Sequence, residues 1–136
     1  MRPKILFVND DIHLCATRKM LFESCGATVY TACGDRSDVE KSLQHPLDLV
    51  IIDSTNVGYE RGEQLCSLVK QVAPSLGVAL LAKPESGLPE KSSADHLVLR
   101  TGPRQMLVRI NELLGERLDV NLWKLKSKHV NEGFIV

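Results

Sequence analysis

The sequence predicts an α/β protein with a doubly wound, parallel sheet of five strands. The first observation is the apolar run Leu47–Ile52, which is rich in β-branched residues, has no polar alternation and is followed by Asp53. Such a run is typical of a strand buried on both faces, and this burial implies helices on each side of a parallel sheet. The second observation is that Lys4–Val8 has the same design before Asn9. The third is the regular alternation of strand-like and helix-like segments, which predicts the fold class.

The first half of the chain alternates strands and helices around the acidic turn that follows the first strand. The turn Asn9-Asp10-Asp11 can cap the helix that follows it, and Gly26 is a suitable residue to end that helix. The second helix begins at Ser37 with the spacing of a capping box and ends before Pro46. In order, we expect a strand at Lys4–Val8, a helix at Ile12–Ser24, a strand at Ala27–Ala32, a helix from Ser37, and a strand at Leu47–Ile52.

The second half contains the less regular segments of the chain. We expect a polar loop at Ser54–Arg61, with Glu60 inside it. Two prolines and a glycine after Lys83 leave room for at most a short helix between Pro89 and Ala94. Proline at the first helical position indicates where the last helix begins. The expected elements are a helix at Gly62–Val72, strands at Gly77–Leu81 and His96–Leu99, and a helix from Gly102 that ends at Gly115 or continues to Leu118.

Length and composition indicate one domain followed by a tail. The chain has 136 residues, of which 43% are hydrophobic, so one core is expected and two are not. We place the domain at residues 1–118 and a tail or linker remnant at residues 119–136, which contains Trp123 and several lysines. The 17 basic and 17 acidic residues cancel, so no global field recruits nucleic acid. The apolar runs are far shorter than the ~20 residues of a membrane span.

Four cysteines lie too far apart in the sequence for a C-x-x-C pair. This spacing argues against a zinc site and against a disulfide framework. We therefore expect four reduced thiols and a cytoplasmic location, without a secretion signal at the start of the chain. The residues are Cys15, Cys25, Cys33 and Cys66.

Polar residues follow the two strands that would lie at the centre of the sheet. In the flavodoxin-like strand order 2-1-3-4-5, the first and third strands are neighbours, and ligands bind at the carboxyl ends of such strands. Asp10 and Asp53 would then meet at one edge. Each acid alone has an ordinary explanation, since aspartate caps helices and starts turns. Together, at the ends of neighbouring buried strands, they predict a functional site.

These two segments resemble the receiver domain of two-component response regulators. The similar residues are Val8-Asn9-Asp10-Asp11 after the first strand and Leu49-Val50-Ile51-Ile52-Asp53 at the third. The resemblance extends from Lys4 to about Leu114 and includes the order of helices and strands. It covers most of the chain.

The resemblance implies a phosphoryl-accepting site that contains Mg²⁺. Asp53 would accept a phosphoryl group from the histidine of a kinase or of a phosphotransfer protein. The metal ligands would be Asp10, Asp53, the backbone carbonyl of Thr55 and, more weakly, Asn9. A hard cation with oxygen ligands would neutralise the charges that otherwise repel the attacking carboxylate and orient the transferring group.

Several positions depart from the pattern of that family. Asn9 stands where the family has an acid, and an amide keeps an oxygen but loses the charge. Ala82 stands where a serine or threonine hydroxyl contacts the phosphoryl group, and Arg100 stands in place of a lysine. Lys83 is a weaker candidate for the phosphoryl contact, and Leu97 replaces an aromatic residue that transmits the signal. The resemblance therefore implies an acceptor with an altered response.

Three functions remain open at this stage. The first, which the resemblance favours, is a receiver domain, not an enzyme, that accepts a phosphoryl group on Asp53. It would signal through contacts with an unknown downstream protein or with a second copy of itself in a homodimer. The second is a pseudo-receiver, the same fold used as an interaction module without phosphorylation, as Asn9, Ala82 and Arg100 suggest. The third is a small nucleotide or flavin binder, which the lack of a glycine-rich loop after the first strand disfavours.

Overall fold

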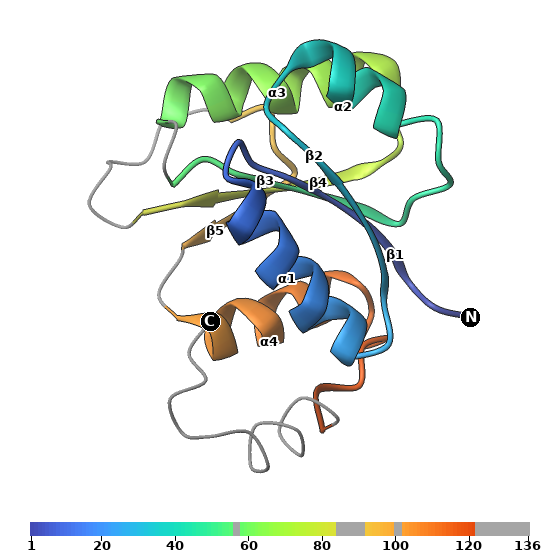
Figure 1. The fold of residues 1–136 in the computed structure, drawn as a ribbon. Helices are drawn as coiled ribbons and strands as arrows, with labels where there is room; N and C mark the ends of the chain where they lie inside the picture. The colour runs from blue at the N-terminus through green and yellow to red at the C-terminus, as the bar shows by residue number, and fades with distance from the viewer. Residues whose placement is uncertain (56–57, 84–91, 100–101, 122–136) are drawn as a thin grey trace.

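A parallel sheet of five strands forms the centre of the protein, with helices on both faces. The computed structural model describes residues 1–55, 58–83, 92–99 and 102–121. The strand order is β2-β1-β3-β4-β5, and every pairing is parallel. Figure 1 shows α2 and α3 on one face and α1 and α4 on the other. The elements are β1 (Lys4–Val8), α1 (Ile12–Ser24), β2 (Thr28–Ala32), α2 (Arg36–Ser42), β3 (Leu49–Asp53), α3 (Tyr59–Val72), β4 (Gly77–Ala82), β5 (His96–Leu99) and α4 (Pro103–Leu113).

The strand residues divide between two hydrophobic cores because successive side chains point to opposite faces of a sheet. In β1, Ile5 and Phe7 pack with α1 and α4, whereas Leu6 and Val8 pack with α2 and α3. All five residues of β3 are buried. This two-sided burial confirms the predicted flavodoxin-like sheet and the central position of the third strand.

Two helices begin at other residues than expected. Asp35, and not Ser37, is the N-cap of α2, and its carboxylate accepts a hydrogen bond from the Ser37 N–H. The third helix begins at Tyr59, so the prediction that Glu60 and Arg61 lie in a loop is wrong. Gly58, with a φ of +93°, makes the sharp turn that permits this earlier start.

The described residues after α4 continue to pack on the domain. Leu118 is buried, and the Asp119 N–H donates to the Cys25 carbonyl oxygen at 2.8 Å. The boundary at residue 118 stays a prediction, and most of the expected tail, with Trp123, lies outside the described residues. Of the short helix expected between Pro89 and Ala94, residues 89–91 lie outside the described residues, and residues 92–94 are not helical.

Two composition-based expectations concern the environment of the protein. All four cysteines are free thiols, as their spacing predicts. Within the described part of the chain, no helix combines the length and the apolar character that crossing a membrane would need.

Candidate functional site

Asn9 and Asp53 meet at the carboxyl edge of the sheet. Val8 of β1 pairs with Ile52 of β3, so the next residue of each strand lies at the same edge. The Asn9 side-chain Nδ2 donates to the Asp53 backbone oxygen at 2.9 Å. The Asn9 Oδ1 accepts the Asp11 N–H at 2.8 Å. Both ends of this buried amide are therefore engaged within the protein.

The Asp53 carboxylate is held by the loop that follows it. Asp53 is only 1% exposed. Its Oδ1 accepts two hydrogen bonds from Thr55, from the backbone N–H at 2.9 Å and from the hydroxyl at 2.5 Å. The neighbouring Ser54 hydroxyl donates to the Leu81 carbonyl oxygen at 2.8 Å and fastens this loop to β4. The carboxylate is thus oriented by its own loop and shielded from solvent.

The Asp10 carboxylate is directed to the loop between β2 and α2. Its Oδ1 accepts the Gly34 N–H at 2.6 Å. A Cβ atom built on Gly34 would lie 2.8 Å from this oxygen, so a larger residue would displace the carboxylate. The next residue, Asp11, caps α1 and accepts the N–H groups of His13 and Leu14. The three polar residues after β1 therefore contact three different segments.

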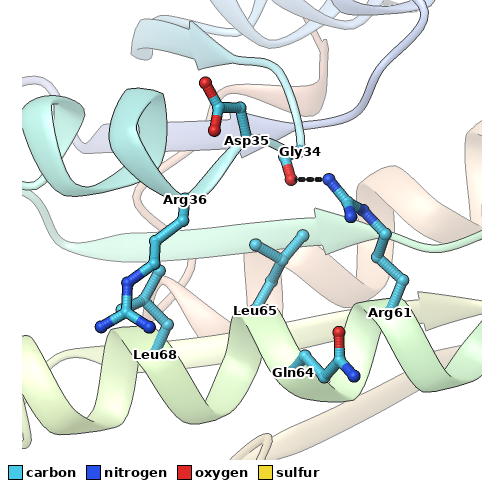
Figure 2. Close-up of a pocket in the computed structure, with 7 residues that line it drawn as sticks. All are labelled: Gly34, Asp35, Arg36, Arg61, Gln64, Leu65 and Leu68. Carbon is cyan, nitrogen blue, oxygen red and sulfur yellow. Dashed lines mark hydrogen bonds between the residues drawn. The ribbon is translucent and has the colours of Figure 1, made fainter.

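Arg61 is a residue of this edge that the sequence reasoning missed. It lies in the first turn of α3, and its guanidinium Nη2 donates a short hydrogen bond to the Gly34 carbonyl oxygen (Figure 2). Gly34 thereby contacts Asp10 through its N–H and Arg61 through its oxygen. The signal in the sequence would have been Gly58, had it been read as a helix start. The hydrogen bond from Arg61 to the Gly34 oxygen spans 27 residues, so no local sequence pattern predicts it.

Cys15 is a second residue near the site that sequence reasoning did not select. Its thiol donates to the Asn9 carbonyl oxygen at 3.3 Å. Burial raises the pKa of Cys15 to about 11, and the negative charges of Asp11 and Asp53 act in the same direction. The thiol is therefore protonated at neutral pH and serves as a hydrogen-bond donor, not as a nucleophile.

The residues expected to contact a phosphoryl group differ in their exposure to solvent. Ala82 ends β4, pairs with Leu99 and is fully buried, so an apolar methyl group occupies the position of the missing hydroxyl. Lys83 follows it and is exposed. Arg100 lies outside the described residues, and its proposed contact stays a prediction. Leu97 is half-buried and packs against the core beneath α2 and α3.

The expected magnesium ligands already make hydrogen bonds within the protein in this arrangement. Mg²⁺ requires near-ideal octahedral coordination by oxygen atoms. One carboxylate oxygen of Asp10 and the amide oxygen of Asn9 accept backbone N–H groups instead. Across residues 1–55, 58–83, 92–99 and 102–121, no three His, Cys, Asp or Glu side chains gather where they could hold a metal ion. The ligand set of Asn9, Asp10, Asp53 and Thr55 therefore remains a proposal.

A cavity of about 430 Å³ lies beside Gly34, between the start of α2 and the face of α3 that carries Leu65 and Leu68. Figure 2 shows Arg36 and Arg61 at opposite ends of this cavity, with Leu65 between them. The lining residues are Gly34, Asp35, Arg36, Arg61, Gln64, Leu65 and Leu68. Asp53 does not line this cavity, so the cavity is separate from the candidate phosphoryl acceptor and lies beside Arg61.

Comparisons with known proteins find relatives by structure only. No protein-family model matches the sequence, and no curated protein matches it. Among solved structures, a CheY-like response regulator receiver domain protein from Methanospirillum hungatei superposes with a TM-score of 0.68 at 19% identity, covering 86% of this chain and 97% of that chain. The chemotaxis response regulator CheY4 of Vibrio cholerae has a TM-score of 0.67 at 19% identity, with 83% and 99% covered.

A third similar structure was solved in complex with ligands. It is the response regulator TrrA of Thermotoga maritima in complex with Mg²⁺ and BeF, with a TM-score of 0.68 at 20% identity, covering 82% of this chain and 98% of that chain. Its sheet and that of this protein therefore superpose over most of both chains. By its strand order, its helix layers and these superpositions, this chain has the fold of the CheY-like receiver domains of response regulators.

Proposed function

We propose that this chain is a signalling module with the receiver fold that works through protein–protein contacts and without phosphoryl transfer at Asp53. The observation that carries the proposal is the engagement of Asn9. Its amide donates to the Asp53 backbone oxygen and accepts the Asp11 N–H. The residue that replaces an expected metal-binding acid is thus a structural link between β1 and β3.

Two further observations support this proposal. The Asp10 carboxylate is bound to Gly34, so the second expected ligand also serves the fold. Ala82 is fully buried and has no hydroxyl to draw toward a phosphoryl group. A ligand shifts a conformational equilibrium only through contacts that differ between the two states. With fewer such contacts, phosphorylation at Asp53 would have little effect on the rest of the domain.

A second candidate function is phosphoryl acceptance at Asp53, assisted by Mg²⁺ and by Arg100. The observation that favours it is the position of Asp53 at the carboxyl end of the central strand. A similar solved structure contains histidine kinase ThkA in complex with response regulator TrrA. On this alternative, a histidine kinase or phosphotransfer protein would be the partner of this chain. The four free thiols support a cytoplasmic location for either function.

Phosphoryl labelling separates the two functions. The purified chain is incubated with acetyl phosphate and Mg²⁺, and the Asp53 peptide is examined by mass spectrometry. We expect no added phosphoryl group on the wild-type chain, and Asp53→Asn, which lacks the candidate acceptor, serves as the matched blank. Stoichiometric labelling that disappears in Asp53→Asn would contradict the proposal and establish the second candidate.

Amide NMR spectra recorded with and without beryllofluoride in the presence of Mg²⁺ provide an independent measurement. Beryllofluoride stands in for the phosphoryl group on Asp53. We expect no shifts in the loops that follow β1 and β3. Shifts in those loops would show that the acceptor site is functional.

A further inference from the structure

We infer that Arg61 supplies, from within the protein, the positive charge that a metal ion would otherwise provide at this acidic edge. Asp10, Gly34 and Arg61 form what we call the latch: the carboxylate of Asp10 binds the Gly34 N–H, and the guanidinium of Arg61 binds the Gly34 oxygen. This inference rests on the proposed function, because a receiver that needs Mg²⁺ would keep Asp10 available to the ion.

The geometry of the latch brings the acid and the cation to the same place. A Cβ atom built on Gly34 would lie 2.8 Å from the Asp10 Oδ1 and 3.5 Å from the Arg61 Nε. The two charged groups therefore approach the same side of Gly34, which has no side chain to separate them. Figure 2 shows the guanidinium of Arg61 reaching from α3 to the Gly34 oxygen.

The position of Arg61 on its helix indicates where the stabilisation comes from. Arg61 is the third residue of α3, and a cation in the first turn of a helix is repelled by the helix dipole. Among the described residues, the interaction that compensates for this repulsion is the hydrogen bond to the Gly34 oxygen. The Asp10 carboxylate adds a favourable charge nearby.

The latch joins three segments that the chain brings together only in the folded state. Asp10 follows β1, Gly34 lies between β2 and α2, and Arg61 belongs to α3. A magnesium ion that bound Asp10 would share this carboxylate with the Gly34 N–H and would lie near a guanidinium of like charge. Arg61 therefore holds Gly34 beside Asp10, and its charge opposes metal binding at the same edge.

The test compares Arg61→Gln with Arg36→Gln, a matched control. Both arginines line the same cavity, but Arg36 pairs with Glu40 on its own helix, and in the described part of the chain it makes no hydrogen bond to Gly34. Mg²⁺ affinity is measured by titration calorimetry and the Gly34 amide by NMR. Removal of a like charge near the ion should tighten Mg²⁺ binding about tenfold in Arg61→Gln. A tenfold change in affinity corresponds to about 1.4 kcal/mol of binding free energy. Arg36→Gln should bind Mg²⁺ as the wild type does.

The Gly34 amide signal reports the latch itself. It should shift in Arg61→Gln and remain in place in Arg36→Gln. A third variant, Arg61→Lys, separates charge from geometry: it keeps the cation but loses the planar fork, so Mg²⁺ binding should stay weak while the Gly34 signal moves. Arg61→Lys also remains informative if the glutamine variant does not fold.

Two results would overturn the inference. One is equal Mg²⁺ affinity in the wild type, Arg61→Gln and Arg36→Gln. The other is an unchanged Gly34 amide signal in both variants of Arg61. Phosphoryl labelling of Asp53 is scored separately. If Asp53 of the wild type is not labelled and the three proteins bind Mg²⁺ equally, the inference about Arg61 is wrong and the proposed function still stands.

Discussion

At the scale of the residue, the difference between an amide and a carboxylate decides what the carboxyl edge of the sheet can do. Asn9 is 3% exposed, and its Nδ2 donates to the Asp53 backbone oxygen. An aspartate at this position would place an acceptor opposite another acceptor and would add a buried charge. Buried polar groups without a suitable partner are costly, so the hydrogen bonds of the Asn9 amide contribute to stability.

The corresponding prediction concerns Asn9→Asp. In the presence of a chelator, we expect the variant to lose about 1–3 kcal/mol of unfolding free energy, the usual cost of a buried group left without its hydrogen bond. Denaturant unfolding measures this change, and Mg²⁺ should restore part of the loss if the new carboxylate faces the ion.

Asn111→Asp is a suitable control for that measurement. The Asn111 Oδ1 accepts the Leu118 N–H, and a carboxylate oxygen can accept the same hydrogen bond. The control should therefore change stability much less than Asn9→Asp. Equal stability of Asn9→Asp and the wild type in the chelator would show that the amide does not contribute to the link between β1 and β3.

At the scale of the element, α3 packs unusually close to the end of β3. Gly62 lies on the buried side of this helix, and a Cβ atom built on it would lie 2.7 Å from the Ser54 Cβ and 2.8 Å from the Leu80 Cδ1. Ser54 is the residue next to Asp53. The distance between α3 and the sheet therefore affects both the candidate acceptor and the start of the helix that carries Arg61.

We predict that Gly62→Ala is destabilising although alanine favours helices. The methyl group has no space, and overpacking of this kind costs about 1–3 kcal/mol, more than the roughly 1 kcal/mol gained in helix propensity. Urea unfolding measures the loss, and amide shifts at Ser54 should accompany it.

Gly77→Ala provides the matched comparison within β4. Its Cβ would lie 3.6 Å from the Leu49 Cδ1, an ordinary contact, so this variant should change stability little. A stable Gly62→Ala protein with unchanged Ser54 signals would mean that α3 moves away from the sheet without cost.

At the scale of the whole molecule, Asp48 links the start of β1 to the chain after α4. Its Oδ2 accepts the Lys4 N–H at 2.7 Å, and its Oδ1 lies 3.2 Å from the Arg117 Nη1. The hydrogen bond from Lys4 lowers the pKa of Asp48 most, burial opposes this change, and Arg117 lowers the pKa further, so the net pKa lies below its ordinary value.

The lowered pKa predicts how stability depends on pH. A carboxylate with a depressed pKa in the folded state stabilises the protein above its ordinary pKa, and this contribution is lost as the pH falls through the folded value. Thermal unfolding should show Asp48→Asn less stable than the wild type at pH 6. The difference should shrink below the ordinary value of 3.8.

Arg117→Gln removes only the second contact of Asp48 and should show a smaller difference of the same sign. A gap between the wild type and Asp48→Asn that stays constant down to pH 2.5 would contradict the assignment of this pH dependence to Asp48.

The sequence by itself determined the fold class, most element bounds and the positions of the polar residues at the strand ends. These features depend on local patterns, such as the unbroken apolar run before Asp53 and the β-branched residues within it. The bounds of β1 and α1 agree with the expectation because a strand run and an aspartate cap are both read from neighbouring residues. The sequence also showed that Asn9 and Ala82 differ from the receiver pattern, because a residue type can be read without knowing its contacts.

Only the tertiary structure decided what those residues contact. Asn9 meets Asp53 across 44 residues, Asp10 meets Gly34 across 24, and Arg61 meets Gly34 across 27. Which hydrogen bond each side chain makes depends on the distance between loops that the sheet and α3 set together, and no local pattern records that distance. The sequence therefore predicted where the acidic side chains lie. The hydrogen bonds that engage them, and the position of Arg61 beside them, follow from the packing of the whole domain.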